Sequence, residues 1–174
     1  MPRRNILLYP DKQLKVVSKP VTDFDEKLRG FIQELEEAMG DGPGAVGIAA
    51  PQVGHAIRAI IVDVSSHKKL THHGHLILIN PEIVEWDGLV TGREGCLSVP
   101  DYTGNVVRAE RIKLSAFDPF GKELNFDMQG YEARAVQHEI DHLDGMLFLD
   151  RLVSRRHDLF ERKTYKKKKK TQNE

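Results

Sequence analysis

The segment YEARAVQHEIDHL, residues 131–143, decides the fold expected for this chain. Its apolar positions recur at the spacing of one helix face, and they are Ala133, Val136, Ile140 and Leu143. A second stripe on another side of the same helix consists of Tyr131, Ala135, His138 and His142. Because little of the circumference is freely polar, we expect a helix buried among sheets, which Gly145 ends.

The segments before this helix carry strand patterns. Residues 56–64 (AIRAIIVDV) and 76–79 (LILI) are rich in β-branched or apolar side chains and predict two strands, the second ended by Asn80-Pro81. Apolar and polar residues alternate at 112–116 and again at 124–128, on either side of the turn Asp118-Pro119-Phe120-Gly121. This pattern predicts a β-hairpin.

An amphipathic helix is expected nearer the N-terminus. Its apolar positions keep one face against a core, and they are Phe24, Leu28, Phe31, Leu35 and Met39. Thr22 or Asp23 can cap its start, and the glycines and proline of residues 40–44 end it. The predicted class is therefore α+β: largely antiparallel β-sheets surround one buried central helix, with an N-terminal helix and a basic C-terminal helix or tail.

Composition places the chain among ordinary globular domains. It has 174 residues, of which 40% are hydrophobic and 30% charged, and no apolar run approaches the roughly 20 residues that span a bilayer. The N-terminus has no long apolar segment or cleavage site typical of a signal peptide. A single cysteine excludes an internal disulfide. We expect a cytoplasmic protein without a membrane partner.

The zero net charge conceals an uneven distribution. From Arg151 onward there are ten basic and three acidic residues, a net +7, so the first 150 residues carry −7. We expect a catalytic domain at 1–152 and a basic helix or tail at 153–174, with five consecutive lysines at 166–170. Such a block is either a solvated tail or an attachment to an RNA-rich surface, such as the ribosome, through residues 162–170. That attachment would be blind to nucleic-acid sequence and would weaken with salt.

The central helix contains an HExxH motif, His138-Glu139-Ile140-Asp141-His142. Two histidines at positions i and i+4 share one helix face, so both imidazoles can bind one metal ion. Glu139 lies about 100° round the helix from His138, where it can accept a proton from a water beside the metal. The motif predicts a metal-dependent hydrolase, and the alternative is two core histidines and a solvated glutamate at chance spacing.

A catalytic metal site usually needs a third protein ligand and one open position. Phe148 occupies the position where a metzincin would have its third histidine. Glu161 would serve a zinc endopeptidase but lies in the basic tail, which is a poor place for a buried ligand. Cys96 is the better candidate, since a thiolate binds zinc or ferrous iron strongly and glycines surround it in residues 92–98. Alone, Cys96 would be interpreted as an inert buried thiol.

Three blocks of sequence together resemble the signature motifs of the peptide deformylases. They are GIAAPQ at residues 47–52, EGCLS at 94–98 and QHEIDHLDG at 137–145. The resemblance extends from about Leu8 to Leu152. One difference is Ala45, which replaces the glycine that usually begins the first motif, and which fits if its φ angle is negative.

The resemblance implies an activity and a set of residue roles. The implied reaction removes the formyl group from formyl-methionyl nascent polypeptides and releases formate, with Cys96, His138 and His142 as metal ligands and Glu139 as the base. The resemblance further implies that the Gln52 amide and the Leu97 N–H stabilise the oxyanion. Ferrous iron (Fe2+) is implied as the native metal, and zinc, nickel or cobalt can occupy the same site.

The resemblance also implies how a peptide binds. The substrate would lie extended beside the backbone, in the manner of an added β-strand, and the residues expected to contact it are Val46, Gly47, Gly95 and Tyr131. Val46 and Tyr131 would line the methionine pocket. Arg108 would pair with Glu94 and fix the cysteine loop. Arg134 stands beside the metal-binding stripe, and we expect it to be a support or a rim residue.

Two further interpretations remain open. The basic tail is compatible with an RNA-binding accessory protein that carries a degenerate site, although the intact Cys/His/His/Glu set argues against it. A second histidine cluster precedes the LILI strand, formed by His67, His72, His73 and His75. We expect a solvent-exposed polar loop there rather than a second metal site.

Overall fold

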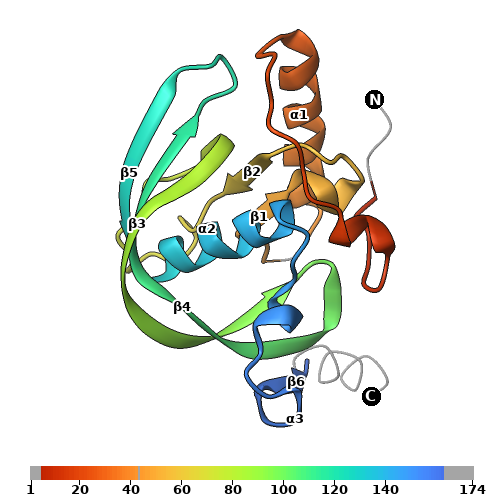
Figure 1. Cartoon of the computed structure of the whole chain (residues 1–174), viewed down its shortest axis with the longest axis vertical. Coiled ribbons are helices and arrows are strands. Elements are labelled where there is room, and N and C mark those ends of the chain that lie inside the picture. Colours follow the sequence, from red (N-terminus) through yellow and green to blue (C-terminus); the bar gives the residue numbers. More distant parts are fainter. Residues whose placement is uncertain (1–4, 43, 163–174) are drawn as a thin grey trace.

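One antiparallel sheet dominates the fold of this computed structural model, in which residues 5–42 and 44–162 are described (Figure 1). Five strands pair in sequential order and a sixth pairs with β4: β1 (Gly47–Ala49), β2 (Ala59–Val62), β3 (Leu76–Cys96), β4 (Val99–Phe117), β5 (Glu123–Gln129) and β6 (Leu159–Glu161). The helices are α1 (Glu26–Gly40), α2 (Gly130–Leu143) and α3 (Arg155–Asp158), with 3-10 turns η1 (Lys12–Lys15), η2 (Ala50–Val53) and η3 (Phe148–Arg151). The predicted α+β class with an antiparallel sheet is confirmed.

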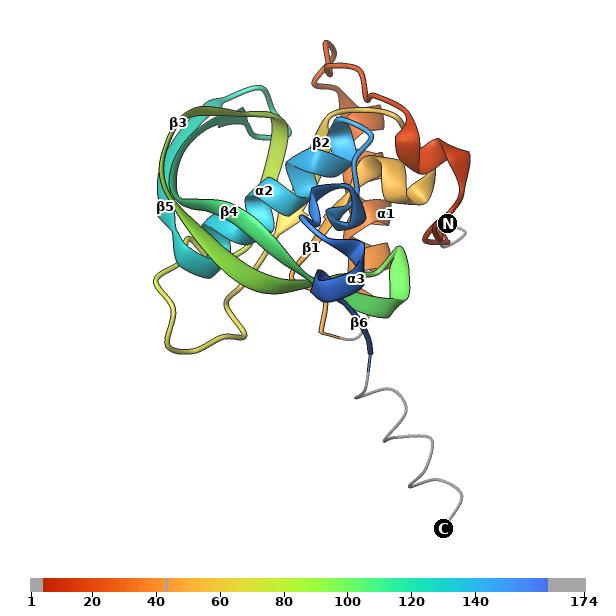
Figure 2. The same cartoon turned by 60° about the horizontal axis from the view of Figure 1, so that its bottom comes forward.

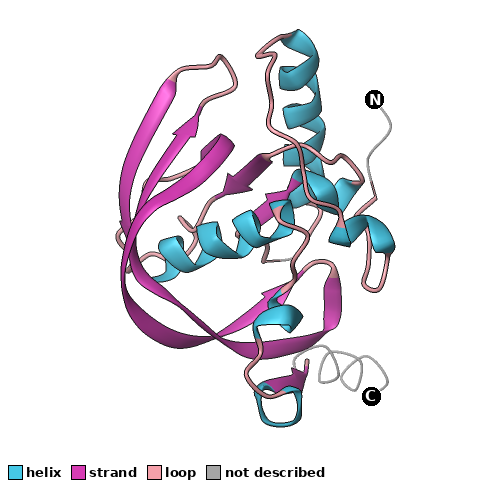
Figure 3. Ribbon diagram, viewed as in Figure 1, coloured by secondary structure: helices cyan, strands magenta, loops and turns pink. Residues whose placement is uncertain are grey.

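The two longest strands, β3 and β4, form a hairpin that curves around α2 (Figure 3). The expected end of the LILI strand at Asn80-Pro81 was wrong, because β3 continues to Cys96. Asn80 adopts a positive φ of 51°, which asparagine tolerates better than most residues, and its side chain exchanges hydrogen bonds of 2.8 and 2.9 Å with the Val21 backbone. The register with β4 shifts between Ile79 and Glu82, around Pro81, and pairing with β4 continues from Glu82. The predicted hairpin of β4 and β5 is confirmed.

Strand β2 separates two hydrophobic clusters because its side chains alternate between the two faces of the sheet. Ile60 and Val62 join the cluster that includes the apolar face of α2. Ala59 and Ile61 join the cluster that includes the apolar face of α1. The sheet edge formed by β1 and β2 therefore lies between the two helices (Figure 2).

Helix α1 begins later than either predicted cap allowed. Asp25 is the capping residue, and its carboxylate accepts a hydrogen bond of 3.0 Å from the Leu28 N–H. The caps predicted at Thr22 or Asp23 were wrong. The first N–H groups of a helix have no partner within it, and Asp25 is placed to accept from one of them, that of Leu28.

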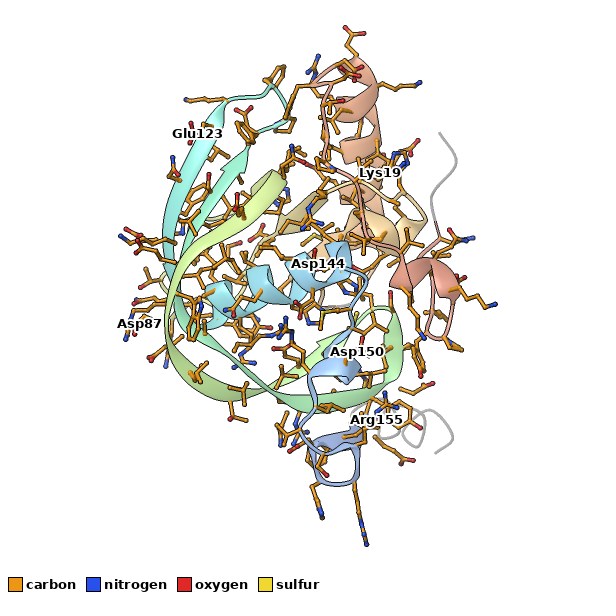
Figure 4. The ribbon with its side chains drawn as sticks, viewed as in Figure 1. Lys19, Asp87, Glu123, Asp144, Asp150 and Arg155 are labelled. Atoms are coloured by element: carbon orange, nitrogen blue, oxygen red, sulfur yellow. The ribbon has the colours of Figure 1, made fainter. Side chains whose placement is uncertain are left out.

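Helix α2 is enclosed over most of its length, since its apolar and polar side chains are almost all buried. It ends before Gly145, whose φ of 76° favours glycine and whose missing side chain leaves room for the Lys15 carbonyl. Asp144, labelled in Figure 4, lies at this end and pairs with Arg58 at 3.0 Å. Because α2 is enclosed, His138, Glu139 and His142 face the interior rather than solvent.

The segment after Leu152 differs from the expected helix or tail. Helix α3 is only four residues long, and β6 then pairs with β4, with Thr103 opposite Phe160 and Gly104 opposite Leu159. The segment can approach β4 closely because Gly104 has no side chain. A Cβ there would lie only 2.7 Å from the Leu152 side chain and 3.2 Å from the Asp158 carbonyl oxygen. The five lysines at 166–170 lie outside the described residues.

Within the described ranges, no helix is both long enough and apolar enough to cross a membrane.

Candidate metal centre and substrate cavity

Cys96, His138 and His142 meet in the interior of the protein. The two histidines lie one turn apart on α2, and Cys96 is the last residue of β3, where the register with β4 shifts before a two-residue turn. All three are buried, and their ligand atoms lie within 4.8 Å of one another. Cys96 Sγ is 3.4 Å from His142 Nε2. Among the described residues, no other group of His, Cys, Asp and Glu side chains converges in this way.

Glu94 fixes the orientation of His138. Its carboxylate lies 2.9 Å from His138 Nδ1 and accepts hydrogen bonds of 2.9 and 2.8 Å from Arg108. Arg134 donates a further bond of 2.7 Å to the same carboxylate. Because Nδ1 is engaged by Glu94, His138 presents Nε2 to the sulfur and to His142. The predicted Arg108–Glu94 pair is confirmed, and Arg134, expected as a support or a rim residue, is a buried support of this carboxylate.

Asp141 extends the same network and was missed by the sequence analysis. Its carboxylate accepts hydrogen bonds from Arg108 and Arg151, one of them 2.8 Å long. A signal existed, since a carboxylate between Ile140 and His142 in a helix expected to be buried requires a cationic partner. The network therefore ties the back of α2 to β4 and to η3.

Glu139 lies in the interior without a hydrogen-bond partner for Oε1 among the described residues. Burial raises its pKa to about 7, and the charge of neighbouring His138 only partly opposes this effect. Its carboxyl group packs against the backbone of β1, where a Cβ on Gly47 would lie 2.6 Å from Oε2. A carboxyl with a pKa near neutrality can accept and return a proton at physiological pH.

The two histidines differ in their affinity for protons. Burial lowers the pKa of His138, but hydrogen bonds with Cys96 and Glu94 outweigh burial and raise the pKa well above its ordinary value. Burial lowers the pKa of His142 well below its ordinary value, and the charge of His138 adds to this. The two imidazoles, one helix turn apart, therefore differ in how readily each accepts a proton.

Gln52 is buried beside Cys96 and its side-chain amide is oriented at both ends. Its Oε1 accepts a hydrogen bond of 2.9 Å from the Ala49 N–H, which leaves Nε2 directed toward the cysteine. Nε2 lies 3.6 Å from Cys96 Sγ and donates a bond of 3.1 Å to Ser98 Oγ. Ser98 is fully buried and was missed, because a single serine after a cysteine carries no signal of its own.

A cavity of about 500 Å³ opens onto this group. Every residue expected to contact a peptide lines it, namely Val46, Gly47, Gly95 and Tyr131. Leu97, Glu139 and His138 line it as well. Ala45, at the same cavity, is not strained, since Asn80 is the only non-glycine residue with a positive φ in the described chain.

The upstream histidines contribute no ligand to the Cys96 group and form no second cluster within the described residues. His73 pairs with the buried Glu132 at 2.6 Å, and His75 lies 3.1 Å from Asp63. The His67 ring packs 4.8 Å from the ring of Tyr131 at the cavity. Glu161, the ligand required by the endopeptidase alternative, is exposed in β6 and is not among the residues that line the cavity.

Comparison with known proteins identifies relatives over most of the chain. A family model described as polypeptide deformylase matches residues 3–158. A peptide deformylase of Nautilia profundicola is 43% identical over 164 residues, which cover 94% of this chain and 91% of that protein. The crystal structure of a peptide deformylase from Legionella pneumophila has a TM-score of 0.79 at 42% identity and covers 87% of this chain and 86% of that one.

A Met-Ala-Ser-bound class I type b peptide deformylase from Acinetobacter baumannii has a TM-score of 0.80 at 34% identity. The match covers 87% of this chain and 99% of that structure. Strand β6 and Arg162 follow residue 158, beyond the stretch that matches the family model.

Proposed function

The chain belongs to the polypeptide deformylase family, and on this basis we propose that it hydrolyses the N-terminal formyl group of formyl-methionyl polypeptides, releasing formate and a free amino terminus. The observation that carries the proposal is the burial of Cys96, His138 and His142 together, with the Glu139 carboxyl group beside them at a peptide-sized cavity. The endopeptidase alternative lacks its third ligand, because Glu161 is exposed at the end of β6 and does not line the cavity. New formylated chains are made in the cytoplasm, which is the location we propose.

We propose that Cys96, His138 and His142 hold one divalent metal ion. The donor set fits this role, since a thiolate and two imidazoles suit iron or zinc and the Glu94 carboxylate fixes one imidazole from behind. We propose ferrous iron as the native ion, with zinc, nickel and cobalt as substitutes. An ion held there supplies a Lewis acid and lowers the pKa of a nearby water toward about 7.

The side chains around this group would share the remaining work. Glu139 would take a proton from the attacking water and pass it to the departing amine, which suits its raised pKa. Gln52 Nε2 and the Leu97 N–H would donate to the formyl oxygen as it becomes negative. Val46 and Tyr131 would line the methionine pocket, while the backbone at Gly47 and Gly95 would hold the peptide extended.

The test uses the full chain purified without oxygen, with metal analysis and two activity assays. Formate release from formyl-Met-Ala-Ser is expected, and cleavage of an internal peptide bond is not. The isosteric variant Glu139→Gln is expected to keep its metal and to retain only a small residual rate of deformylation. Internal cleavage without formate release would overturn the function, and full activity of Glu139→Gln would overturn the assigned base.

We also propose that the lysines at 166–170 attach the enzyme to the RNA-rich surface of the ribosome, where formylated chains emerge. The support is their charge alone, since they lie outside the described residues. Co-sedimentation with ribosomes is expected to fade with added salt and with deletion of the residues after Tyr165. Binding that survives the deletion unchanged would exclude the tail.

A further inference from the structure

Strand β6 brings a cation of the C-terminal segment into the substrate cavity. Arg162 follows β6 directly and donates its backbone N–H to the Asp101 carbonyl at 3.0 Å, so the pairing with β4 extends to this residue. Its side chain lines the same cavity as Cys96 and Glu139. Arg162 belongs to residues 153–174, the segment expected to form a basic helix or tail.

A contact between Phe160 and Arg93 helps to fix the position of β6. The ring of Phe160 stacks under the guanidinium of Arg93, with Cζ 3.7 Å from the ring centroid. Arg93 itself is held by hydrogen bonds to Asn105 at 3.1 Å and Thr103 at 3.3 Å. An aromatic ring under a hydrogen-bonded guanidinium is a cation–π contact of specific geometry. Arg162, two residues after Phe160, is therefore held at the cavity by its own neighbours in the chain.

The Arg162 guanidinium lies against Gly95, at the backbone proposed to hold the peptide. A Cβ on Gly95 would lie 2.6 Å from Arg162 Nη2 and 3.6 Å from Cζ, so the guanidinium occupies the space that a side chain would take. Its Nε is buried and has no hydrogen-bond partner within the described residues. A buried donor left unsatisfied is unfavourable, and this penalty is removed when an acceptor enters.

The surroundings favour an anionic acceptor. Arg93, which also lines the cavity, donates to the neutral oxygens of Asn105 and Thr103. Glu94, which follows Arg93 in the chain, is occupied by Arg108, Arg134 and His138. Glu161, which precedes Arg162, is exposed in β6. In the described part of the chain, neither Arg93 nor Arg162 has a carboxylate partner. Two guanidinium groups without carboxylates thus lie at the Gly95 end of the cavity.

We infer that Arg162 is a specificity-determining residue that binds the carboxylate of an acidic side chain at the second or third position of the formyl-methionyl substrate. The inference rests on the proposed deformylase function and extends it to residues beyond the methionine. A guanidinium presents two parallel donors to a carboxylate, and such charge-assisted bonds are about twice as strong as neutral ones. Glutamate is therefore favoured over the isosteric glutamine at one of these positions.

The test compares formyl peptides that differ only in Glu versus Gln, in the series Met-X-Ser and Met-Ala-X. The wild type is expected to prefer Glu by on the order of tenfold in kcat/KM, mainly through KM, at one of the two positions. Arg162→Gln is expected to reduce this ratio to about one. Arg162→Lys keeps the charge but not the paired donors and is expected to retain only part of the preference.

The matched control is Arg155→Gln, which removes the same charge from exposed helix α3, outside the residues that line the cavity (Figure 4). Its Glu/Gln ratio is expected to equal that of the wild type. Metal content and Tm of each variant show that the fold is intact. Equal turnover of Glu and Gln peptides by the wild type, or a preference that persists in Arg162→Gln, would overturn the inference. Absence of formate release from formyl-Met-Ala-Ser would instead overturn the proposed function.

Discussion

Gly47 controls where the Glu139 carboxyl group lies, and Gly47→Ala tests the role of that position. The backbone of Gly47 is not in the left-handed region, so alanine is compatible with β1. Its Cβ would lie 2.6 Å from Glu139 Oε2, 2.9 Å from Cγ and 3.0 Å from Cδ. Ordinary contacts begin at 3.4 Å, so the carboxyl group must retreat by about 1 Å.

A retreat of this size is expected to lower kcat by on the order of 100-fold, since a misplacement of about 1 Å at a reacting group costs that much. The metal content is expected to stay at the wild-type level, because the three atoms nearest to the added methyl group all belong to Glu139. Gly30→Ala is the control, as a Cβ there meets nothing within 4 Å. It is expected to leave kcat unchanged and to stabilise α1 by up to about 1 kcal/mol.

The assay is formate release from formyl-Met-Ala-Ser, with kcat separated from KM because Gly47 also lines the substrate cavity. In a Glu139→Gln background, Gly47→Ala is expected to cause no further loss of kcat, since both changes act on one carboxyl group. A kcat within threefold of the wild type would refute the reasoning that the position of Glu139 limits the reaction. Additive losses in the double variant would show that the methyl group acts elsewhere.

Three further substitutions test the surrounding groups. Cys96→Ser is expected to lose most of its metal after desalting, because a hydroxyl is a poorer ligand than a thiolate for iron or zinc; a fully loaded, active variant would place the third ligand elsewhere. Gln52→Ala is expected to lower kcat by about 10²–10³ with intact metal, and a loss below fivefold would contradict its oxyanion role. Glu94→Gln is expected to cost about 3–5 kcal/mol of unfolding free energy, measured by urea denaturation, because it leaves Arg108 and Arg134 without their shared carboxylate. Burial alone raises the pKa of Glu94, but hydrogen bonds from Arg108 and His138 outweigh burial and lower the pKa in the folded protein. The stabilisation that ionised Glu94 gives the fold is therefore complete above its ordinary pKa of 4.5 and is lost as the pH falls toward the lower pKa of the folded state. Below pH 4.5, Tm is expected to fall more steeply in the wild type than in Glu94→Gln.

Hydrophobic periodicity predicted the elements whose buried and exposed residues alternate regularly along their own sequence. The hairpin of β4 and β5 alternates with a period of two because one face of each strand packs against the core. The end of β3 could not be predicted in the same way. Asn80-Pro81 is a turn signal by local rules, but Asn80 is held by Val21, which is 59 residues away in the chain. Pairing with β4 then outweighs the local preference.

The candidate site was predictable to the extent that its residues are close in sequence. His138, Glu139 and His142 share one helix, so their relative positions follow from helix geometry. The carboxylate behind His138 comes from β3 and its cationic partner from β4, and only tertiary pairing brings them together. The resemblance to a family supplied Cys96 and Gln52, whereas spacing alone could not.

The C-terminal segment shows why net charge is a poor guide to structure. A count of lysines and arginines from Arg151 onward treats every cation as equivalent and predicts a helix or tail, yet Arg162 lies against Gly95 in the cavity. The adjacent pair Leu159-Phe160 was the available signal, because two apolar side chains in a solvated tail lose the stabilisation that burial provides. They pack against Gly104 and Arg93, which lie more than fifty residues earlier in the chain. A charged terminal segment that contains two adjacent apolar residues is therefore expected to pack against the domain as far as those two residues. A basic residue just after them, such as Arg162, is a candidate for a specific contact.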